Sequence, residues 1–508
     1  MSELGPPAPS VETALPDPIE ADNVVYNPSP DRLRELSSHL ETTTEFGSPS
    51  YVSDQRSRCA DRTKNAVDDE FDERDRAHVE DALAVARERE MVCVDRQMGR
   101  GPDHTYRCRY YVPVEYGRIA LTLTRLFEPA EADADGPGAP EPDFLTVQVP
   151  EWDETAIRVL PEEGVTAVLG SDYSGEAKKS FLRLFMHDAK RAGGLGLHAG
   201  SKRVRIRRDG DLTEVGQLFL GLSATGKSTL TAHGLWLDEP ESATMLQDDV
   251  CALLPDGTVA GSEGNGLYVK TIGLDAEEQP AMHAAVTHES AVLENVDVAD
   301  DGAVDFDSDR YTTNGRAAIL REHLASAGEE IDLGGVDQIF FITRNPAMPP
   351  VAKLSPAEAA AAFMLGESIQ TSAGDPSKAG ESIRVVGTNP FIVGSEGAEG
   401  NRFRDLVESL DVDAFVLNTG DLGGSKDVGV EDSVTILREI ARGTVEWTDD
   451  EATGLTVPAS VPGMDVGEFA VPDHVEDYER RLADLRAERR AYLATFDDLD
   501  EEIERAVY

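Results

Sequence analysis

Gly221-Leu-Ser-Ala-Thr-Gly-Lys-Ser228 is the stretch that decides the fold of this 508-residue chain. It fits the phosphate-binding loop pattern G-x-x-x-x-G-K-[ST] at every required position. The apolar run at residues 216–220 indicates a short buried strand before it, and residues 229–233 can begin a helix after it. A strand, a glycine-rich turn and a helix in this order form the context in which the pattern holds phosphates. We therefore expect this chain to bind a nucleotide.

Each part of such a loop has a defined task. Backbone N–H groups of the loop and the start of the helix face the phosphates. The Lys227 side chain would reach the β- and γ-phosphates, and the Ser228 hydroxyl would face a divalent cation. The predicted nucleotide-binding loop is Gly221, Leu222, Ser223, Ala224, Thr225, Gly226, Lys227 and Ser228.

Two adjacent carboxylates, Asp248 and Asp249, end the short run that begins at Ala243. A Mg²⁺–triphosphate site needs a carboxylate from the strand beside the loop. In so acidic a chain most Asp-Asp pairs are solvated surface. The position of this pair, about twenty residues after a phosphate loop, makes it the candidate for the metal carboxylates.

Composition excludes several classes of partner. The chain has 97 Asp and Glu against 47 Lys and Arg, and its net charge of −50 is spread along its length. Such a surface offers no counterion release to nucleic acid or to an anionic membrane, so we expect neither as a partner. Lysine is also rare beside arginine. An acidic, lysine-poor surface indicates a halophilic protein that stays soluble in a salty cytosol.

Cysteine usage and hydropathy point to a reducing, aqueous compartment. The four cysteines form no Cys-x-x-Cys pair and have no zinc-binding spacing, so we expect reduced thiols. No apolar run approaches the ~18 residues of a membrane span, and the N-terminus lacks a basic region followed by an apolar one. We expect a cytoplasmic location.

The pattern of elements predicts an α/β protein. Residues 1–30 would be a disordered tail, and residues 31–210 an N-terminal domain. In that domain we expect a helix at 76–90, strands at 91–94, 144–149 and 164–169, a surface loop at 128–142 and a helix beginning near Glu176. Residues 211–508 would be the P-loop domain, with buried strands at 338–343 and 414–419.

A stripe of apolar residues at helical spacing marks the C-terminal end. It consists of Val475, Tyr478, Leu482, Leu485, Tyr492 and Phe496 between charged faces. We expect a helix that docks on the core of the P-loop domain.

Further motifs flank the loop in a fixed order. They are Tyr173-Ser-Gly-Glu-Ala-Lys178-Lys179, Leu197-His198, Gln247-Asp248-Asp249, Glu263-Gly-Asn-Gly-Leu-Tyr268-Val-Lys270, Val292-Leu-Glu294-Asn295-Val296, Asn314-Gly-Arg316 and Asn418-Thr-Gly420. In order and spacing this set resembles the ATP-dependent phosphoenolpyruvate carboxykinases over most of residues 165–500. The resemblance implies a two-domain fold with a mixed sheet around the P-loop. It also implies the conversion of oxaloacetate and ATP to phosphoenolpyruvate, CO₂ and ADP in gluconeogenesis, and favours a monomer.

The resemblance assigns a metal site. It implies that Lys179, His198 and Asp249 bind a Mn²⁺ that bridges the γ-phosphate and the keto acid, and that Ser228 faces the Mg²⁺ of the nucleotide. A mixed set of nitrogen and oxygen ligands suits a transition metal. A lysine can ligate only as the neutral amine, which a neighbouring cation favours.

The resemblance also assigns the substrate site. It places Lys178 and Arg316 at the oxaloacetate and phosphoryl oxygens, and Tyr173 in the substrate pocket. An arginine that grips the oxaloacetate carboxylate falls at Arg56 or Arg58, and Arg56 is favoured because Arg56-Ser57 keeps the family's Arg-Ser order. Glu294 and Ser433 complete the implied nucleotide site together with Arg316. The implied catalytic residues are Lys178, Lys179, Lys227, Asp248, Asp249 and Arg316.

Two other functions fit parts of the sequence. A kinase or phosphorylase like HPr kinase shares the loop and the acidic residues after it, but does not need Lys178, Lys179 and His198 as a set. A nucleotide-binding relative without catalysis would explain Ala224, which replaces a family glycine, and Asp427, which stands where the family has an arginine beside adenine.

The net charge makes stability depend on salt. Lowering KCl from about 1 M to about 0.1 M lengthens the Debye distance from ~3 Å to ~10 Å and strengthens the repulsion among carboxylates. We expect the melting temperature to fall on that dilution. An identical Tm at the two concentrations would contradict this expectation.

Overall fold

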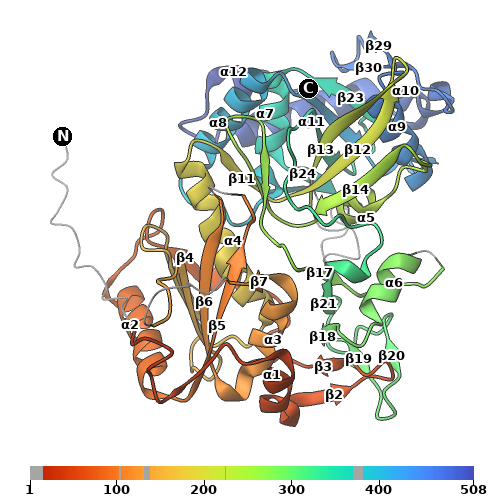
Figure 1. Ribbon diagram of the computed structural model, residues 1–508. Helices are drawn as coiled ribbons and strands as arrows, with labels where there is room; N and C mark the ends of the chain where they lie inside the picture. The colour runs from red at the N-terminus through yellow and green to blue at the C-terminus, as the bar shows by residue number, and fades with distance from the viewer. Residues whose placement is uncertain (1–14, 102–103, 131–137, 223–224, 278, 370–381) are drawn as a thin grey trace, which may run out of the picture. The chain divides into compact units, whose positions relative to one another are not determined.

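The computed structural model describes residues 15–101, 104–130, 138–222, 225–277, 279–369 and 382–508. The chain forms two compact units (Figure 1). The first contains Met1–Met98, Thr105–Leu184 and Asn265–His323, and the second contains Gly99–His104, Phe185–Gly264 and Leu324–Tyr508. A single boundary near residue 210 therefore does not describe the chain. Residues 185–210 belong to the second unit, and residues 265–323 return to the first because their strands pair with N-terminal ones.

The first unit is built on an eight-stranded mixed sheet. Helix α2 (Glu73–Glu88) packs Val79 and Leu83 on one face. Helix α4 (Ser174–Arg191) contacts the other, where the hydroxyls of Thr146 and Ser180 lie 2.7 Å apart. The strand order is β1 (Val24–Tyr26), β5 (Met91–Met98), β6 (Tyr106–Pro113), β8 (Phe144–Val149), β10 (Val165–Leu169), β9 (Ala156–Leu160) and β4 (Thr63–Asn65), and β7 (Glu128–Pro129) pairs with β5.

Several predicted elements of this unit are confirmed. The strand at 144–149 has the predicted bounds, and α2 and α4 begin within three residues of the predicted starts. Of the predicted loop at 128–142, residues 131–137 lie outside the described residues, and Glu128–Pro129 are a short strand.

The prediction of a disordered tail over residues 1–30 is wrong in its second half, where a strand forms. Residues 1–14 lie outside the described residues, but Val24–Tyr26 pair in parallel with Met91, Val92 and Cys93. The Tyr26 hydroxyl donates to Asp95 at 2.9 Å, and the Asn23 amide donates to the carbonyl of Arg89 at 2.6 Å. These contacts hold residues 23–26 in place, although the composition of residues 1–30 is typical of a disordered tail.

A second sheet in the first unit joins strands that are far apart in the sequence. Its order is β17 (Gly266–Lys270), β21 (Arg316–Leu320), β18 (Val292–Glu294), β3 (Pro49–Tyr51) and β2 (Glu41–Thr43). Helix α3 (Gly117–Leu126) packs against β17 and β21. Smaller elements of the unit are α1 (Pro30–Leu36), α6 (Pro280–Val286), β19 (Asp297–Val298) and β20 (Val304–Asp305).

The second unit is built on another eight-stranded mixed sheet, which carries the phosphate loop. Its order is β14 (Ser242–Gln247), β12 (Ala199–Arg208), β13 (Asp211–Gly221), β22 (Gln338–Thr343), β26 (Asp413–Asn418), β23 (Val351–Leu354), β30 (Thr456–Ser460) and β29 (Glu446–Asp449). Strands β13, β22 and β26 run parallel to one another. The predicted strand at 338–343 is confirmed at both ends, the one at 216–220 is confirmed within β13, and the one at 414–419 is confirmed as β26, which spans Asp413–Asn418.

Alternate residues of these strands face two layers of helices. Phe219 and Phe340 pack with α5 (Lys227–Ala232) and α9 (Val430–Arg442), whereas Leu218 and Phe341 pack with α7 (Pro356–Leu365) and α8 (Glu396–Leu410). Smaller elements are β11 (Leu195–Leu197), β15 (Cys251–Leu253), β16 (Val259–Gly261), β24 (Glu367–Ile369), β25 (Ser382–Arg384), β27 (Asp421–Leu422), β28 (Lys426–Asp427) and α10 (Val471–His474).

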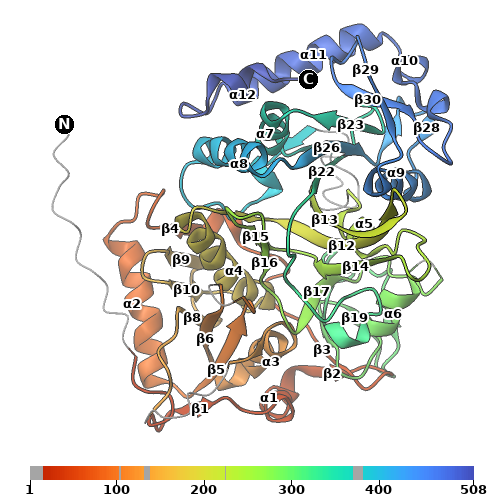
Figure 2. The same cartoon turned by 45° about the horizontal axis from the view of Figure 1, so that its top comes forward.

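The predicted C-terminal docking helix is confirmed as α11 (Tyr478–Leu493), which with α12 (Glu501–Arg505) packs against α7 (Figure 2). This helix also carries a buried arginine, Arg489, that the apolar pattern did not predict. Arg489 is 2% exposed, donates to Glu367 at 2.8 Å and donates to the carbonyl of Tyr508 at 2.6 Å. Burial works to raise the pKa of Glu367, but Arg489 and Arg384 outweigh it and hold that pKa at about 2.

No helix among the described residues is both long and apolar enough to cross a membrane. The four cysteines are buried and unpaired by disulfides, as predicted.

Removing the buried charge of α11 should destabilise the second unit. Arg489→Met leaves the Glu367 carboxylate buried beside Arg384 alone, and breaking a buried pair costs about 3–5 kcal/mol. Arg490→Met, an exposed neighbour on the same helix, is the control and should change the free energy of unfolding by less than about 0.5 kcal/mol. Equal effects of the two variants in urea unfolding would show that Glu367 does not need Arg489.

Candidate active site

The phosphate loop of the second unit joins β13 to α5. Gly226 lies before the helix with φ +96°, a left-handed conformation that side chains rarely adopt. The Thr419 hydroxyl donates to the carbonyl of Thr225 at 2.7 Å, so the Asn418-Thr-Gly420 motif holds the loop. Lys227 is buried at the first position of α5, and Ser228 beside it is exposed. Ser223 and Ala224 lie outside the described residues.

A wholly buried lysine fixes the other end of α5. Lys202, on β12, donates to the carbonyls of Leu230 and His233 at 2.5 and 2.8 Å. Such carbonyls at a helix end have no partner within the helix. Burial lowers the pKa of Lys202 to about 7. Because α5 is short, this contact sets where Lys227 and Ser228 stand.

Two of the three predicted Mn²⁺ ligands meet in the second unit. His198 Nε2 lies 3.1 Å from Asp249 Oδ1, and both side chains are less than one-fifth exposed. Two ligand atoms at right angles, each about 2.1 Å from a metal, lie about 3.0 Å apart, so this pair is spaced to share a cation. Within the ranges described, no three His, Cys, Asp or Glu side chains come together as a ligand group.

The carbonyl of Thr388 selects the tautomer of His198. It lies 2.6 Å from Nδ1, so the neutral ring carries its proton there and keeps a lone pair on Nε2. Thr388 has φ +51°, which is strained for a β-branched residue. Strain of this kind is found where the surrounding structure holds a functional group in place.

Gln247 holds the turn that carries both predicted carboxylates. Its amide donates to the carbonyl of Glu263 at 3.0 Å and accepts from the N–H of Glu263 at 3.1 Å. Asp248 Oδ1 is buried and has no hydrogen-bond partner among the described residues. A buried carboxylate oxygen in this position suits the cation of a bound nucleotide.

In the first unit, Asn314 gathers three of the predicted substrate residues. Its amide donates to the Tyr173 hydroxyl at 3.2 Å and to the carbonyl of Arg56 at 3.0 Å, and its oxygen accepts from Arg316 Nη2 at 2.9 Å. Gly175 is required here, because a Cβ at that position would meet the Tyr173 ring at 2.3 Å. Burial raises the pKa of Tyr173, which remains a neutral phenol at neutral pH.

Tyr268 brings the two cations of this site together. Lys178 Nζ and the Arg316 guanidinium lie 5.7 and 5.6 Å from its ring centre. Lys178 is 1% exposed, so it is no solvated helix residue, whereas Lys179 beside it on α4 is half-buried. A phenol ring and two cations form a surface that favours an anion.

Glu294, predicted near the nucleotide–metal site, is engaged within the first unit. It is 2% exposed and accepts hydrogen bonds from Arg118 at 3.0 Å, from the Ser174 N–H at 3.0 Å and from the hydroxyls of Ser174 and Tyr268. A carboxylate with four donors is suited to hold the site's elements in place.

The two candidate arginines occupy different surroundings. Arg56 Nη1 donates to Asn295 at 2.8 Å, and the guanidinium lies 5.4 Å from the Tyr311 ring centre. Arg58 acts on Glu176, whose pKa is raised by burial against the charges of Arg183 and Arg58. The backbone carbonyl of Arg56 accepts from Asn314, and this contact joins Arg56 to the Asn314 cluster.

Ser433, which the resemblance places at the nucleotide site, lies on α9 of the second unit, and Asp427, which replaces a family arginine, lies just before that helix. Ser433 is 1% exposed and its hydroxyl donates to the carbonyl of Gly429 at 3.0 Å. Asp427, on β28, is exposed.

Four residues of these sites were missed by sequence reasoning. Arg118, Asp172, Lys202 and Thr388 act through partners distant in the sequence, and none stands in a motif that assigns it a role. For Lys202 a signal was present: a lysine interrupts the alternation of a strand in a chain where lysine is rare.

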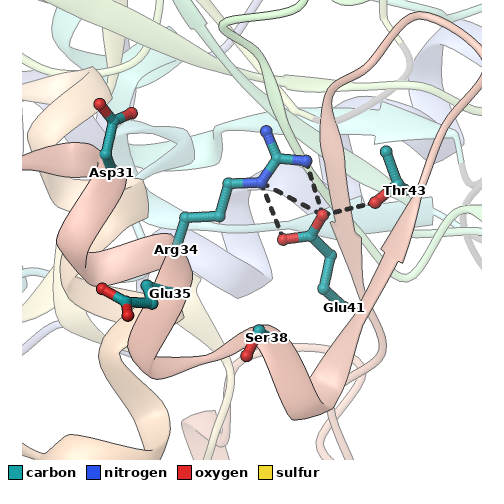
Figure 3. A pocket seen from close by; sticks show the side chains of 6 residues that line it. All are labelled: Asp31, Arg34, Glu35, Ser38, Glu41 and Thr43. Carbon is teal, nitrogen blue, oxygen red and sulfur yellow. Dashed lines mark hydrogen bonds and ion pairs between the residues drawn. The ribbon is translucent and has the colours of Figure 1, made fainter.

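An open hollow elsewhere in the first unit is not a candidate site for an anion. Figure 3 shows Arg34 turned toward Glu41, whose carboxylate also accepts from Thr43. The Arg34–Glu41 ion pair is 2.6 Å long, so the one basic residue of the lining is neutralised. The lining consists of Asp31, Arg34, Glu35, Ser38, Glu41 and Thr43.

Comparison with known proteins bears on these sites. The model of the phosphoenolpyruvate carboxykinase family matches residues 50–467. A phosphoenolpyruvate carboxykinase (ATP) from Aeropyrum pernix is 36% identical over 491 residues, which are 95% of this chain and 96% of that protein. Proteins of the same name from Chelativorans sp. and Azorhizobium caulinodans are 30% and 29% identical, over 70% and 76% of this chain and 65% and 72% of their own lengths.

The buried amine of Lys202 should give stability a distinct pH dependence. Its pKa is about 7 in the folded chain and about 10.4 when unfolded, so between these values only the unfolded chain holds the proton and stability rises with pH. Relative to Lys202→Met, the wild type should gain up to about 1.4 kcal/mol per pH unit from pH 7 to 9. Parallel unfolding free energies for the two proteins across this range would show that Lys202 stays charged.

Proposed function

Because this chain belongs to the ATP-dependent phosphoenolpyruvate carboxykinase family, we propose that its first unit binds oxaloacetate and its second unit binds ATP and the divalent cations. The chain catalyses the family's reaction, in which oxaloacetate loses CO₂ and the resulting enolate takes the γ-phosphoryl group of ATP. The kinase and non-catalytic alternatives are set aside, since the match covers residues 50–467 and the relative from Aeropyrum pernix aligns over 95% of the chain.

The Asn314 cluster carries the proposal for oxaloacetate. The substrate is a dianion with a keto oxygen between its two carboxylates. Arg56 offers a planar fork to one carboxylate, which a lysine would reproduce poorly. Arg316 and Lys178, both beside the Tyr268 ring, supply positive charge where decarboxylation leaves an enolate oxygen. Tyr173, a neutral phenol, can donate a hydrogen bond without adding charge.

The second unit supplies the phosphoryl donor. The loop N–H groups and Lys227 would hold the phosphates. Lys227 would also stabilise the negative charge that develops on the leaving oxygen. Asp248 and Ser228 would hold the Mg²⁺ of the nucleotide. Lys202 and Thr419 hold α5 and the loop in place. The phosphate-binding groups therefore need little rearrangement during the transfer.

The donor set of His198 and Asp249 fits a transition metal, and Lys179 is the family's candidate for the third ligand. Mn²⁺ held there would supply Lewis-acid charge to the keto and phosphoryl oxygens. His198 contributes Nε2 because Thr388 holds its Nδ1 proton, and Asp249 contributes a negative oxygen.

The surface composition supports a halophilic, cytoplasmic setting. A net charge of −50 is tolerated where salt screens repulsion within a few ångströms. We take the physiological direction to be gluconeogenic, as the family resemblance implies.

The choice between Arg56 and Arg58 tests the proposed substrate site. Arg56→Ala should raise KM for oxaloacetate by about tenfold or more and lower kcat, because a charge-assisted contact and its orienting effect are both lost. Arg58→Ala, two residues away, is the matched comparison and should change KM by less than about threefold. ATP affinity should stay the same in both. If neither variant changes oxaloacetate turnover, the first unit does not supply the carboxylate clamp.

Metal binding can be read without activity. His198→Gln should weaken Mn²⁺ binding by about tenfold or more, measured by the electron paramagnetic resonance signal of free Mn²⁺, because one nitrogen ligand is lost. His283→Gln, on α6 of the first unit, is the control and should titrate like the wild type. Overlapping titrations of all three proteins would remove His198 from the ligand set.

A further inference from the structure

We infer that Arg118 is a positioning residue for the carboxykinase reaction: its guanidinium links the segment that carries Arg56 to the helix that carries Lys178 and Lys179. Among the described residues, the hydrogen bonds of the Arg118 side chain go to Glu294 and Asp172, and Arg118 lies outside the motifs that identify the family. The inference rests on the proposed substrate site and adds to it the element that sets its geometry.

Arg118 is a buried cation shared by two buried carboxylates. It lies at the start of α3 and is 1% exposed. Nη1 donates to Glu294 at 3.0 Å, and Nη2 donates to the side chain of Asp172 at 2.8 Å and to its carbonyl at 2.7 Å. Only a forked donor reaches both carboxylates at once, which an ammonium group at one point does not do.

The Asp172 arm of this bridge holds the Arg56 segment. Asp172 Oδ2 accepts from the N–H of Asp54 at 2.9 Å, and Oδ1 accepts from the N–H of Gln55 at 3.0 Å. These are the two residues before Arg56. Both carboxylate oxygens are therefore used to fix the backbone from which the proposed carboxylate clamp extends.

The Glu294 arm holds the start of α4 and the Tyr268 ring. Glu294 accepts from the Ser174 N–H at 3.0 Å, at the positive end of the helix dipole, and from the Tyr268 hydroxyl. Lys178 and Lys179 lie one turn further along α4, and the Tyr268 ring lies beside Lys178 and Arg316. A shift of Glu294 would therefore move the cations that face the enolate.

Charge explains why this bridge is an arginine. Asp172 and Glu294 carry two negative charges in a buried region, and without Arg118 they would repel each other. The Arg118 guanidinium attracts both carboxylates. It therefore sets the distance between the Arg56 segment, held by Asp172, and α4, held by Glu294. Misplacement of binding groups by about 1 Å can cost about 100-fold in rate.

The test compares Arg118→Lys with Arg109→Lys in the full chain at constant high salt. Arg109 is an equally matched buried arginine of the first unit, 7% exposed, that pairs bidentately with Asp95 at 2.8 Å on strands β5 and β6. Both variants keep the positive charge and lose the fork. The readouts are Tm, KM and kcat for oxaloacetate, and the Kd of ATP.

We expect both variants to lower Tm, but only Arg118→Lys to raise the oxaloacetate KM by about tenfold or more and to lower kcat. The Kd of ATP should stay within about twofold. Arg118→Lys kinetics equal to those of Arg109→Lys, at a comparable loss of Tm, would overturn the inference and leave Arg118 a structural residue.

Further variants cover the case in which Arg118→Lys does not fold, and they separate failure of this inference from failure of the proposed substrate site. If Arg118→Lys does not fold, Asp172→Asn against Asp95→Asn makes the same comparison, since each amide keeps an acceptor oxygen and loses the charge. Arg316→Met tests the proposed substrate site itself, and its oxaloacetate turnover is measured in the same assay. If Arg316→Met leaves this turnover unchanged, the proposed substrate site is wrong. If it impairs turnover while Arg118→Lys and Asp172→Asn match their controls, only the role of Arg118 is wrong.

Discussion

The buried carboxylate of Glu294 is the contact on which the site of the first unit depends. It receives donors from α3, from the start of α4 and from β17, so three elements distant in sequence meet at one anion. An unpaired carboxylate at 2% exposure would be strongly destabilising, so these donors stabilise the fold of the unit. The same requirement places Lys178, Tyr268 and, through Arg118 and Asp172, the Arg56 segment. Stability and the arrangement of the proposed substrate site therefore have one cause.

The second unit solves a different problem, which is to hold a short helix at the end of a strand. Gly226 allows the turn, Thr419 holds the loop, and Lys202 binds the far end of α5. In both units a buried polar side chain fixes the backbone, Glu294 in the first and Lys202 in the second, and the groups proposed to meet substrate extend from that fixed backbone. This is how an enzyme that must stabilise an enolate and a transferring phosphoryl group keeps its donors aimed before the reaction begins.

The sequence predicted what local patterns can carry. The strand and helix that flank the phosphate-loop motif, the strand at 338–343 and the C-terminal docking helix follow from motif spacing and apolar periodicity, and they are confirmed as β13, α5, β22 and α11. It did not predict that residues 265–323 return to the first unit, because strand pairing such as Leu293 with Ser50 leaves no local signal. Nor did it predict Arg118 or Arg489 as buried, since their partners, Glu294 and Glu367, stand 176 and 122 residues away. The motifs pointed to Glu294 itself but not to its contacts, which engage it within the first unit.

The most direct test of this account is Glu294→Gln, with the KM of oxaloacetate and the Kd of ATP measured on the same folded protein. The amide keeps the shape of the side chain but loses the charge that Arg118, Ser174 and Tyr268 share. The account predicts an oxaloacetate KM raised by about tenfold or more with ATP affinity unchanged, since the loss is of oriented substrate contacts in the first unit. A weakened Kd for ATP with an unchanged KM for oxaloacetate would contradict it and would place Glu294 at the nucleotide instead.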